Sequence, residues 1–327
     1  MGRYLLRRLL IAIPVLLGIT FIAFAALALA PGDPILARID PSILAQQSPE
    51  WIEDRRRELG LDQPIPVQYL KWLSGLIQGD LGYSVATRRS VGDELRTRLP
   101  VSLKLMGAAL LFGIVLGVPF GALAALKQHS RLDYALSSLT MLLISTPTFF
   151  LGLLAIYLFG VHLRLLPTGG MATLGAVPNL ADQIRHLLLP ATVLGLRNAA
   201  LLMRHTRSSL LEVLREDHVT TARGKGLSRR VVFLRHVLRN ALIPIISVLG
   251  FLLPELVVGA VITEQVFAWP GMGFMAVRAA ADRDPSMLMG VVLVVGIGVL
   301  ISTLAADIAY AVADPRVRLT QKQKTWI

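Results

Sequence analysis

Residues 204–240 hold nine of the 33 lysines and arginines of the chain, together with an acidic pair, Glu216-Asp217, and a basic turn, Gly224-Lys225-Gly226. The Gly-Lys pair lacks the Gly-x-x-x-x-Gly-Lys-Ser/Thr spacing of a phosphate-binding loop, so no such nucleotide site is expected in this chain. The absence of cysteine excludes a thiolate nucleophile, a cysteine zinc site and a disulfide. This stretch is therefore expected to bind another surface, without chemistry on a substrate.

The same stretch predicts two short helices joined by a glycine turn. After the turn, apolar residues recur at spacings of four, three and four, which defines one apolar helical face: Leu227, Val231, Leu234 and Leu238. Ser228 is placed to cap this second helix. Glycine suits the turn because it adopts positive φ without steric cost and lets another protein approach the backbone. Spacing alone leaves two interpretations open, a docking site for a protein or an amphipathic pair of helices lying on anionic lipid headgroups.

The elements that must position this stretch are membrane-spanning helices. The chain of 327 residues is 54% hydrophobic and 17% charged, far from the composition of a soluble domain. A helix needs roughly 20 apolar residues to cross a bilayer core. Six runs of this kind occur, over 9–30, 101–126, 134–160, 187–203, 241–266 and 288–313. The predicted fold class is an all-α polytopic membrane protein with six transmembrane helices.

Basic residues predict the orientation. Four segments, 1–8, 127–133, 204–240 and 314–327, carry 18 basic and five acidic residues, and all four lie on one side if six helices cross. Short basic loops stay in the cytoplasm, so both termini are expected there. A cleavable signal peptide is the alternative for the first run, but its 22 apolar residues exceed the roughly 7–15 of a signal core. The expected divisions are 1–30 (N-terminal stub and first helix), 31–100 (extracytoplasmic segment), 101–313 (five-helix core containing the loop 204–240) and 314–327 (cytoplasmic tail).

Two ionisable residues, Arg197 and Glu255, lie near the middles of the fourth and fifth runs. Such groups cost at least about 2.5–3.5 kcal/mol inside a membrane and usually face a cavity or a partner. They are candidates for lining a pathway or for pairing with each other, and a structural contact to another subunit is the alternative. Glu264, near the outer end of the fifth run, is expected to support the turn from Pro270 to Gly273. The stretch from Ser145 to Pro147 is expected to kink the third run.

The loop 204–240 resembles the cytoplasmic "EAA" loop of the integral membrane permeases of ATP-binding-cassette importers. Thr220-Thr221-Ala222 stands for the first three residues of that pattern and Gly226 for its glycine, while Thr220 replaces the usual acid and Arg239 the usual proline. The resemblance is closer to the dipeptide/oligopeptide permease subfamily. Its landmarks recur in order along the chain, among them Pro31-Gly32-Asp33-Pro34, Leu59-Gly60-Leu61-Asp62, Gly79-Asp80-Leu81-Gly82, Arg207-Ser208-Ser209, Arg283-Asp284-Pro285 and Asp314-Pro315-Arg316. An aromatic residue that the family often has between Asp282 and Pro285 is absent.

This resemblance implies a type I importer permease fold in the bacterial cytoplasmic (inner) membrane. It implies as partners a second related permease, two ATP-binding-cassette ATPase subunits, an extracytoplasmic solute-binding protein and membrane lipid, and no nucleic acid. The chain would be a transport subunit and no enzyme, without a cofactor or metal of its own, since ATP and Mg would be bound by the ATPase subunits. The implied ATPase-coupling residues are Glu216, Asp217, Thr220, Thr221, Ala222, Arg223, Gly224, Lys225 and Gly226.

Peptides are the expected substrate, and a nickel chelate, glutathione or a sugar are alternatives within the same importer class. A secondary transporter driven by an ion gradient would need midplane charges, for which Glu255 is the one candidate. A structural or signalling membrane protein would also fit six spans and a basic loop.

Overall fold

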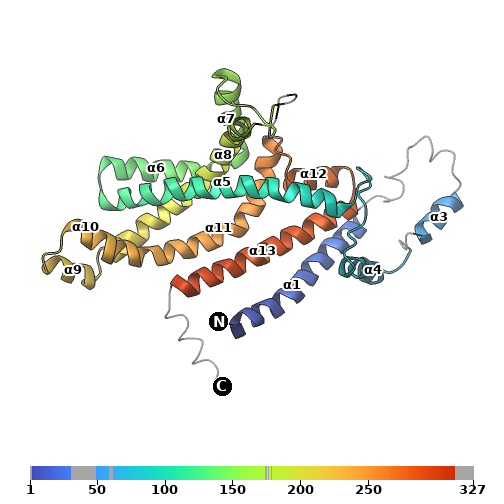
Figure 1. Ribbon diagram of the computed structural model, residues 1–327, viewed down its shortest axis with the longest axis horizontal. Helices are drawn as coiled ribbons and strands as arrows, with labels where there is room; N and C mark the ends of the chain where they lie inside the picture. The colour runs from blue at the N-terminus through green and yellow to red at the C-terminus, as the bar shows by residue number, and fades with distance from the viewer. Residues whose placement is uncertain are drawn as a thin grey trace. The chain divides into compact units, whose positions relative to one another are not determined.

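The computed structural model describes residues 2–30, 49–58, 62–173, 175, 177 and 179–313. Across these ranges the chain is helical, with one isolated antiparallel bridge between Tyr83 and Ser90 (Figure 1). Several sequence landmarks lie outside the described residues: Pro31-Gly32-Asp33-Pro34, Leu59-Gly60-Leu61 and the tail 314–327.

The helices are named as in Figure 1. In chain order they are α1 (Gly2–Leu29), α3 (Pro49–Glu58), α4 (Ile65–Ile77), α5 (Val91–Leu126), α6 (Arg131–Ser145), α7 (Thr148–Ala155), the π-helix η2 (Ile156–His162), α8 (Leu180–Val213), α9 (Asp217–Gly224), α10 (Arg229–Val231), the π-helix η3 (Val232–Leu238), α11 (Arg239–Val266), α12 (Met272–Ala281) and α13 (Pro285–Ala313). They form two compact units. The first comprises Met1–Val101 and Gly271–Ile297, and the second comprises Ser102–Pro270 and Gly298–Ile327.

Within the described residues, five helices are long and apolar enough to cross a membrane. The number rises to six if the bent pair formed by α6 and the α7–η2 segment counts as one span. The run 134–160 is thus not one straight helix, because its two halves meet at 104°. Thr146 has the extended conformation (φ −87°, ψ 128°) that a following proline imposes, and Pro147 then starts a new helix. The break is much sharper than the kink expected from the sequence.

In the first unit, α4 packs on α1 through aromatic side chains. The hydroxyl of Tyr69 lies 2.9 Å from Thr20 Oγ1 and donates to the carbonyl of Leu17 at 3.1 Å. Its ring meets Phe21 edge-on and stacks on Trp72, with centroids 5.2 and 5.8 Å apart. Tyr69 therefore holds α4 to α1 by both hydrogen bonds and ring contacts.

A second anchor in this unit is the carboxylate of Asp284, which is 1% exposed. Its Oδ2 accepts hydrogen bonds from Ser84 Oγ (2.6 Å) and from the backbone N–H groups of Val85 (2.8 Å) and Ala86 (3.3 Å). Its Oδ1 accepts from the N–H of Met287 at 3.0 Å, which caps α13. One buried carboxylate thus fixes the loop before α5 against the start of α13.

In the second unit, α8 is the central helix and contacts α6, α7 and α11. Its backbone also approaches α5 closely along three glycines spaced four apart. A Cβ at Gly113 would lie 2.8 Å from Asn198 Cβ, one at Gly117 would lie 2.6 Å from the carbonyl of Ala199, and one at Gly121 would lie 2.6 Å from that of Met203. Small residues at such spacing let membrane helices pack backbone to backbone.

Glu264 is fully buried at the outer end of α11. Its carboxylate accepts a hydrogen bond of 2.5 Å from Ser102 Oγ on α5, and its backbone carbonyl accepts from the N–H of Trp269 at 2.8 Å. The side chain therefore ties α11 to α5, while the backbone carbonyl begins the turn that leads to Pro270.

Replacing Gly117 with alanine should destabilise the second unit. The new Cβ would meet Ala199 and Leu202 at 2.6 and 2.7 Å, and overpacking of this kind typically costs about 1–3 kcal/mol. Gly107→Ala is the matched control, because a Cβ on this residue of the same helix meets nothing within 4 Å and alanine favours a helix by about 1 kcal/mol. Thermal unfolding of the purified protein in detergent should show a lower midpoint for Gly117→Ala only. Equal midpoints would argue against close packing of α5 on α8.

Replacing Asp284 with asparagine should loosen the loop before α5. All four groups around this carboxylate are donors, so an amide NH₂ would face at least one of them, which typically costs about 1–3 kcal/mol. Arg88 and Arg89 in this loop are exposed, and trypsin should cleave after them about tenfold faster in the variant. Asp282→Asn, at an exposed neighbour of Asp284, is the control. Unchanged cleavage in Asp284→Asn would show that the loop does not depend on this carboxylate.

Candidate functional site

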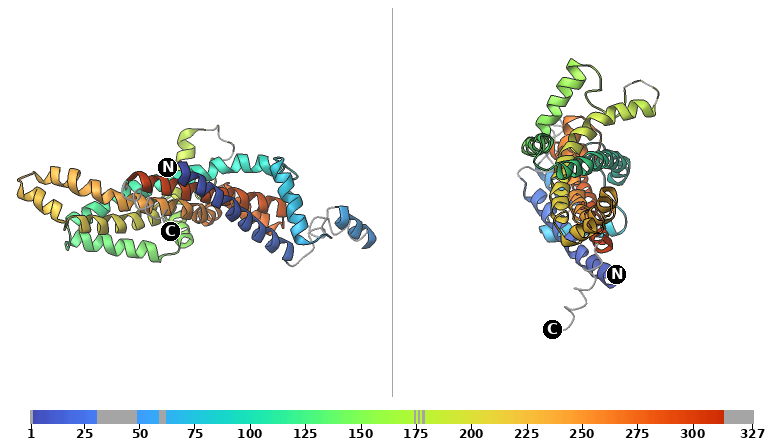
Figure 2. Two further views of the ribbon diagram at one scale, coloured as in Figure 1. Left: turned by 90° about the horizontal axis from the view of Figure 1, so that it is seen from below. Right: turned by 90° about the vertical axis from the view of Figure 1, so that its left-hand side faces the viewer.

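The stretch singled out in the sequence forms a helical arm between α8 and α11, seen in two further orientations in Figure 2. α8 ends at Val213, and Glu216 occupies the N-cap position of α9 with an extended backbone (φ −72°, ψ 148°). After α9, a turn leads through α10 and η3 directly into α11. The arm thus consists of α9, α10 and η3, which together connect the two long helices α8 and α11.

The arm is held by an apolar cluster that we call the arm cluster, formed by Ala125, Leu210, Val213, Val219, Ala222, Val232, Val237 and Ala241. These residues come from the end of α5, the end of α8, the inner face of α9, and η3 with the start of α11. Val219 is 0% exposed and Ala222 is 5% exposed. Full burial of a valine side chain contributes about 1.5–3 kcal/mol, whereas exposed ion pairs contribute about 0–1 kcal/mol. Apolar contact therefore holds α9 against the ends of the long helices.

The opposite face of α9 and the turn after it are exposed. Eight of the nine predicted coupling residues are exposed, namely Glu216, Asp217, Thr220, Thr221, Arg223, Gly224, Lys225 and Gly226. Ala222 differs from this group, because its side chain lies inside the arm cluster. Its side chain packs against the ends of the long helices, and a contact of Ala222 with another protein stays a prediction.

The turn after α9 has the conformation that the glycine pattern predicts. Gly226 has φ +78°, which is in the left-handed region, and its N–H donates to the carbonyl of Arg223 at 3.0 Å. Nothing lies within 4 Å of the position of a Cβ at Gly226. Glycine is therefore required here by backbone conformation and not by crowding. Ser228 stands at the N-cap of α10, although its side chain makes no capping hydrogen bond.

A polar network that the sequence pattern did not reveal pins the start of α9 to the start of α11. The Nδ1 atom of His218 lies 2.9 Å from Glu216 Oε2, and its Nε2 lies 3.1 Å from Asn240 Nδ2. Asn240 Nδ2 also donates to the carbonyl of His236 at 3.0 Å. With Nδ1 donating to the carboxylate, the lone pair on Nε2 accepts from Asn240. No sequence periodicity pairs residues 22 positions apart, so only the fold brings these two side chains together.

A second polar contact fixes the base of the arm. Arg207 on α8 binds Asp133 on α6 in bidentate fashion, with Nε–Oδ1 and Nη2–Oδ2 distances of 2.6 and 2.8 Å. Asp133 is 1% exposed and also accepts from the backbone N–H of His129 at 3.0 Å. A bidentate pair of a half-buried arginine with a buried aspartate holds two helices in a defined register.

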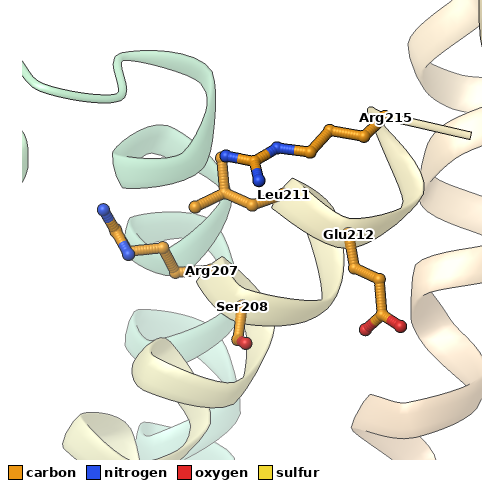
Figure 3. A pocket seen from close by; sticks show the side chains of 5 residues that line it. All are labelled: Arg207, Ser208, Leu211, Glu212 and Arg215. Carbon is orange, nitrogen blue, oxygen red and sulfur yellow. The ribbon is translucent and has the colours of Figure 1, made fainter.

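Beside this ion pair, an open pocket lies on the last turns of α8, lined by Arg207, Ser208, Leu211, Glu212 and Arg215 (Figure 3). In this view the side chain of Glu212 points away from the guanidinium groups of Arg207 and Arg215. The lining carries two guanidinium groups, of which that of Arg207 is bound to Asp133, together with one carboxylate, one hydroxyl and one leucine.

Of the two predicted pathway residues, Arg197 and Glu255, the structure describes the side chain of Arg197 only. Arg197 lies on α8 and is exposed in the isolated chain. Glu255 belongs to α11, but its side chain lies outside the described residues. The pairing of Arg197 with Glu255 therefore stays a prediction.

Two family comparisons match the chain. Residues 117–319 match the family described as binding-protein-dependent transport system inner membrane component, and residues 1–106 match the N-terminal region of such membrane components. A protein of Brucella suis biovar 1, named as a peptide permease, is 44% identical over 98% of this chain and 100% of its own length. The oligopeptide transport system permease protein AppB of Bacillus subtilis is 40% identical over 97% of this chain and 99% of its own length. The dipeptide transport system permease protein DppB of Escherichia coli K12 is 37% identical, again over 97% and 99%.

The fold is also that of solved permeases. Inward-facing structures of the MetNI methionine ABC transporter superpose with TM-scores of 0.54 and 0.56 at 18% and 19% identity, and they cover 67% and 68% of this chain and 96% of theirs. The apolar helices, the arm with its glycine turn and these matches lead to one conclusion. The chain belongs to the dipeptide/oligopeptide permease family of ATP-binding-cassette importers, and it is a multi-pass inner-membrane component with the type I importer permease fold.

Proposed function

We propose that this chain forms half of a translocation pathway for di- or oligopeptides, and that α9 is the helix through which ATPase subunits drive it. The coupling role is supported by the difference between the two faces of α9. One face is buried in the arm cluster, and the other presents polar and basic groups to the outside. The peptide substrate is supported by the relatives, which are named as peptide, oligopeptide and dipeptide permeases.

The proposed partners follow from the type of importer. A second related permease would complete the pathway, an extracytoplasmic binding protein would deliver the peptide, and two ATPase subunits would bind ATP and Mg. Thr221, Arg223, Lys225 and the backbone at Gly226 would contact an ATPase subunit. Arg223 and Lys225 are suited to acidic groups there, because both are exposed.

The mechanism rests on how α9 is attached. When two ATPase subunits close on ATP, a helix held by buried apolar contacts moves as a rigid body. Its displacement passes to the ends of α5, α8 and α11, since all three contribute to the arm cluster. The network of His218 with Asn240 adds a polar restraint to the same motion. The spans would then move between two states, each favoured by different contacts at the ATPase.

If the chain belongs to a peptide importer, peptide should stimulate ATP hydrolysis by the complex. The complex of this chain with its related permease, ATPases and binding protein should hydrolyse ATP faster, and take up labelled peptide into proteoliposomes, when peptide-loaded binding protein is present. Replacing the phosphate-loop lysine of the ATPase should stop uptake. Uptake at full rate without the ATPases would support an ion-driven transporter and contradict this proposal.

Replacing Gly226 with alanine should weaken coupling. A side chain at positive φ costs about 1–2 kcal/mol, and the turn can relieve this strain by tilting α9. Peptide-stimulated hydrolysis should fall several-fold, and less ATPase should co-purify with the chain.

Gly79→Ala is the matched control, because it introduces the same backbone strain at a residue that lies outside the arm. Gly79 has φ +82°, and a Cβ there also meets nothing within 4 Å, but the residue lies in the first unit. This variant should keep stimulated hydrolysis near the parental rate. Equal losses in both variants would mean that general instability, and not the position of α9, explains the defect.

A further inference from the structure

The apolar face predicted after the glycine turn is on the outside of the arm. Leu227 and Val231 are 41% and 40% exposed, and Leu234 is 61% exposed. The arm cluster is filled from this segment by Val232 and Val237 instead. We use the name outer face of η3 for the exposed Leu227, Val231 and Leu234 and the half-buried Leu238, with the exposed Arg229, Arg230, Arg235 and Arg239 around them.

The packing of η3 indicates how deep its outer face lies relative to the membrane. Val232 and Val237 share the arm cluster with Ala125, which lies one residue before the end of α5. η3 is therefore level with the last turn of an apolar span, where Lys127 follows. The exposed Leu126 of α5 and Leu242 of α11 continue the apolar surface at this level. A surface at this position meets the boundary between acyl chains and headgroups.

The charge of the segment selects one kind of partner. No aspartate or glutamate occurs from His218 to Pro254, while four arginines lie around the outer face. Arginine binds phosphate oxygens through its planar guanidinium group, and its aliphatic stem lies along apolar surface. Anionic phospholipids of the cytoplasmic leaflet offer both an acyl chain for the leucines and a phosphate for the arginines.

We infer that the outer face of η3 is a binding surface for anionic phospholipid. The arm then has two surfaces with different partners. The polar face of α9 is turned to a protein, and the outer face of η3 is turned to the membrane. This goes beyond the proposed coupling role, and it assigns a partner to residues that the coupling helix does not use. Lipid on η3 would hold the base of the arm at the membrane surface while α9 is engaged.

The absence of cysteine in the chain allows a direct test. A fluorophore on Leu234→Cys reports the outer face, and one on Thr221→Cys reports the exposed face of α9. The complete complex is placed in lipid nanodiscs that contain phosphatidylglycerol or phosphatidylcholine with a nitroxide near the headgroup. The parent complex, treated with the same fluorophore, gives the background, and only complexes that retain both ATPases are compared.

The expected result is strong quenching at position 234 and little at position 221, with phosphatidylglycerol the better quencher. The double variant Arg235→Gln/Arg239→Gln should lower the preference for phosphatidylglycerol about tenfold, because each basic residue near the surface contributes to this attraction. Arg235→Lys/Arg239→Lys, which keeps both charges, should retain most of that preference.

Three results would overturn the inference. Quenching at position 234 that is no stronger than at position 221 would show that lipid does not reach the outer face. Quenching that appears without the ATPases and disappears when they bind would identify an ATPase as the occupant. Equal quenching by both lipids would leave an apolar contact without recognition of the anionic headgroup. None of these results depends on whether peptides are the transported solute.

Discussion

The burial of Val219 and Ala222 against the ends of three long helices is the contact on which the arm depends. The arm cluster draws residues from α5, α8, η3 and the start of α11, so α9 cannot be displaced without moving the ends of those helices or exposing apolar surface. Exposing a buried valine costs about 1.5–3 kcal/mol, more than any exposed ion pair along the arm contributes. A force applied to α9 is therefore transmitted into the second unit before the arm detaches.

The packing of the second unit suits the displacement that the proposed coupling requires. α8 lies backbone to backbone on α5 along three glycines, and it is held to α6 by the bidentate pair of Arg207 with Asp133. Both contacts restrict the movement of α8 relative to its neighbours. At the glycines no side chain separates the two helices, and in the ion pair two hydrogen bonds fix the angle between the groups. The sharp break between α6 and α7 is the clearest interruption in this packing. A rigid scaffold that contains such a break is suited to a transition between two discrete arrangements.

The arm places on different surfaces the properties behind the two interpretations that its sequence leaves open. An apolar, arginine-rich helix next to a glycine turn fits protein docking as well as lipid binding. The fold separates these properties in space, because α9 turns its polar face outward while η3 turns its leucines outward. η3 is a π-helix, with more residues in each turn than the 3.6 on which amphipathic patterns are judged. Val232 and Val237, five positions apart, consequently share the inner side.

The amino-acid sequence by itself determined the membrane-spanning class, the position of the arm, the glycine turn at Gly226 and membership of the family. The first three features depend on local composition, on runs of apolar residues and on backbone preferences, which one segment expresses alone. Membership of the family follows from landmark residues that recur in order along the chain. The pairing of His218 with Asn240, the burial of Ala222, the carboxylate of Asp284 at the centre of four donors and the 104° break at Pro147 were decided only by the tertiary structure. Each of these depends on which distant segments lie side by side, and a residue's own type and spacing do not carry that information.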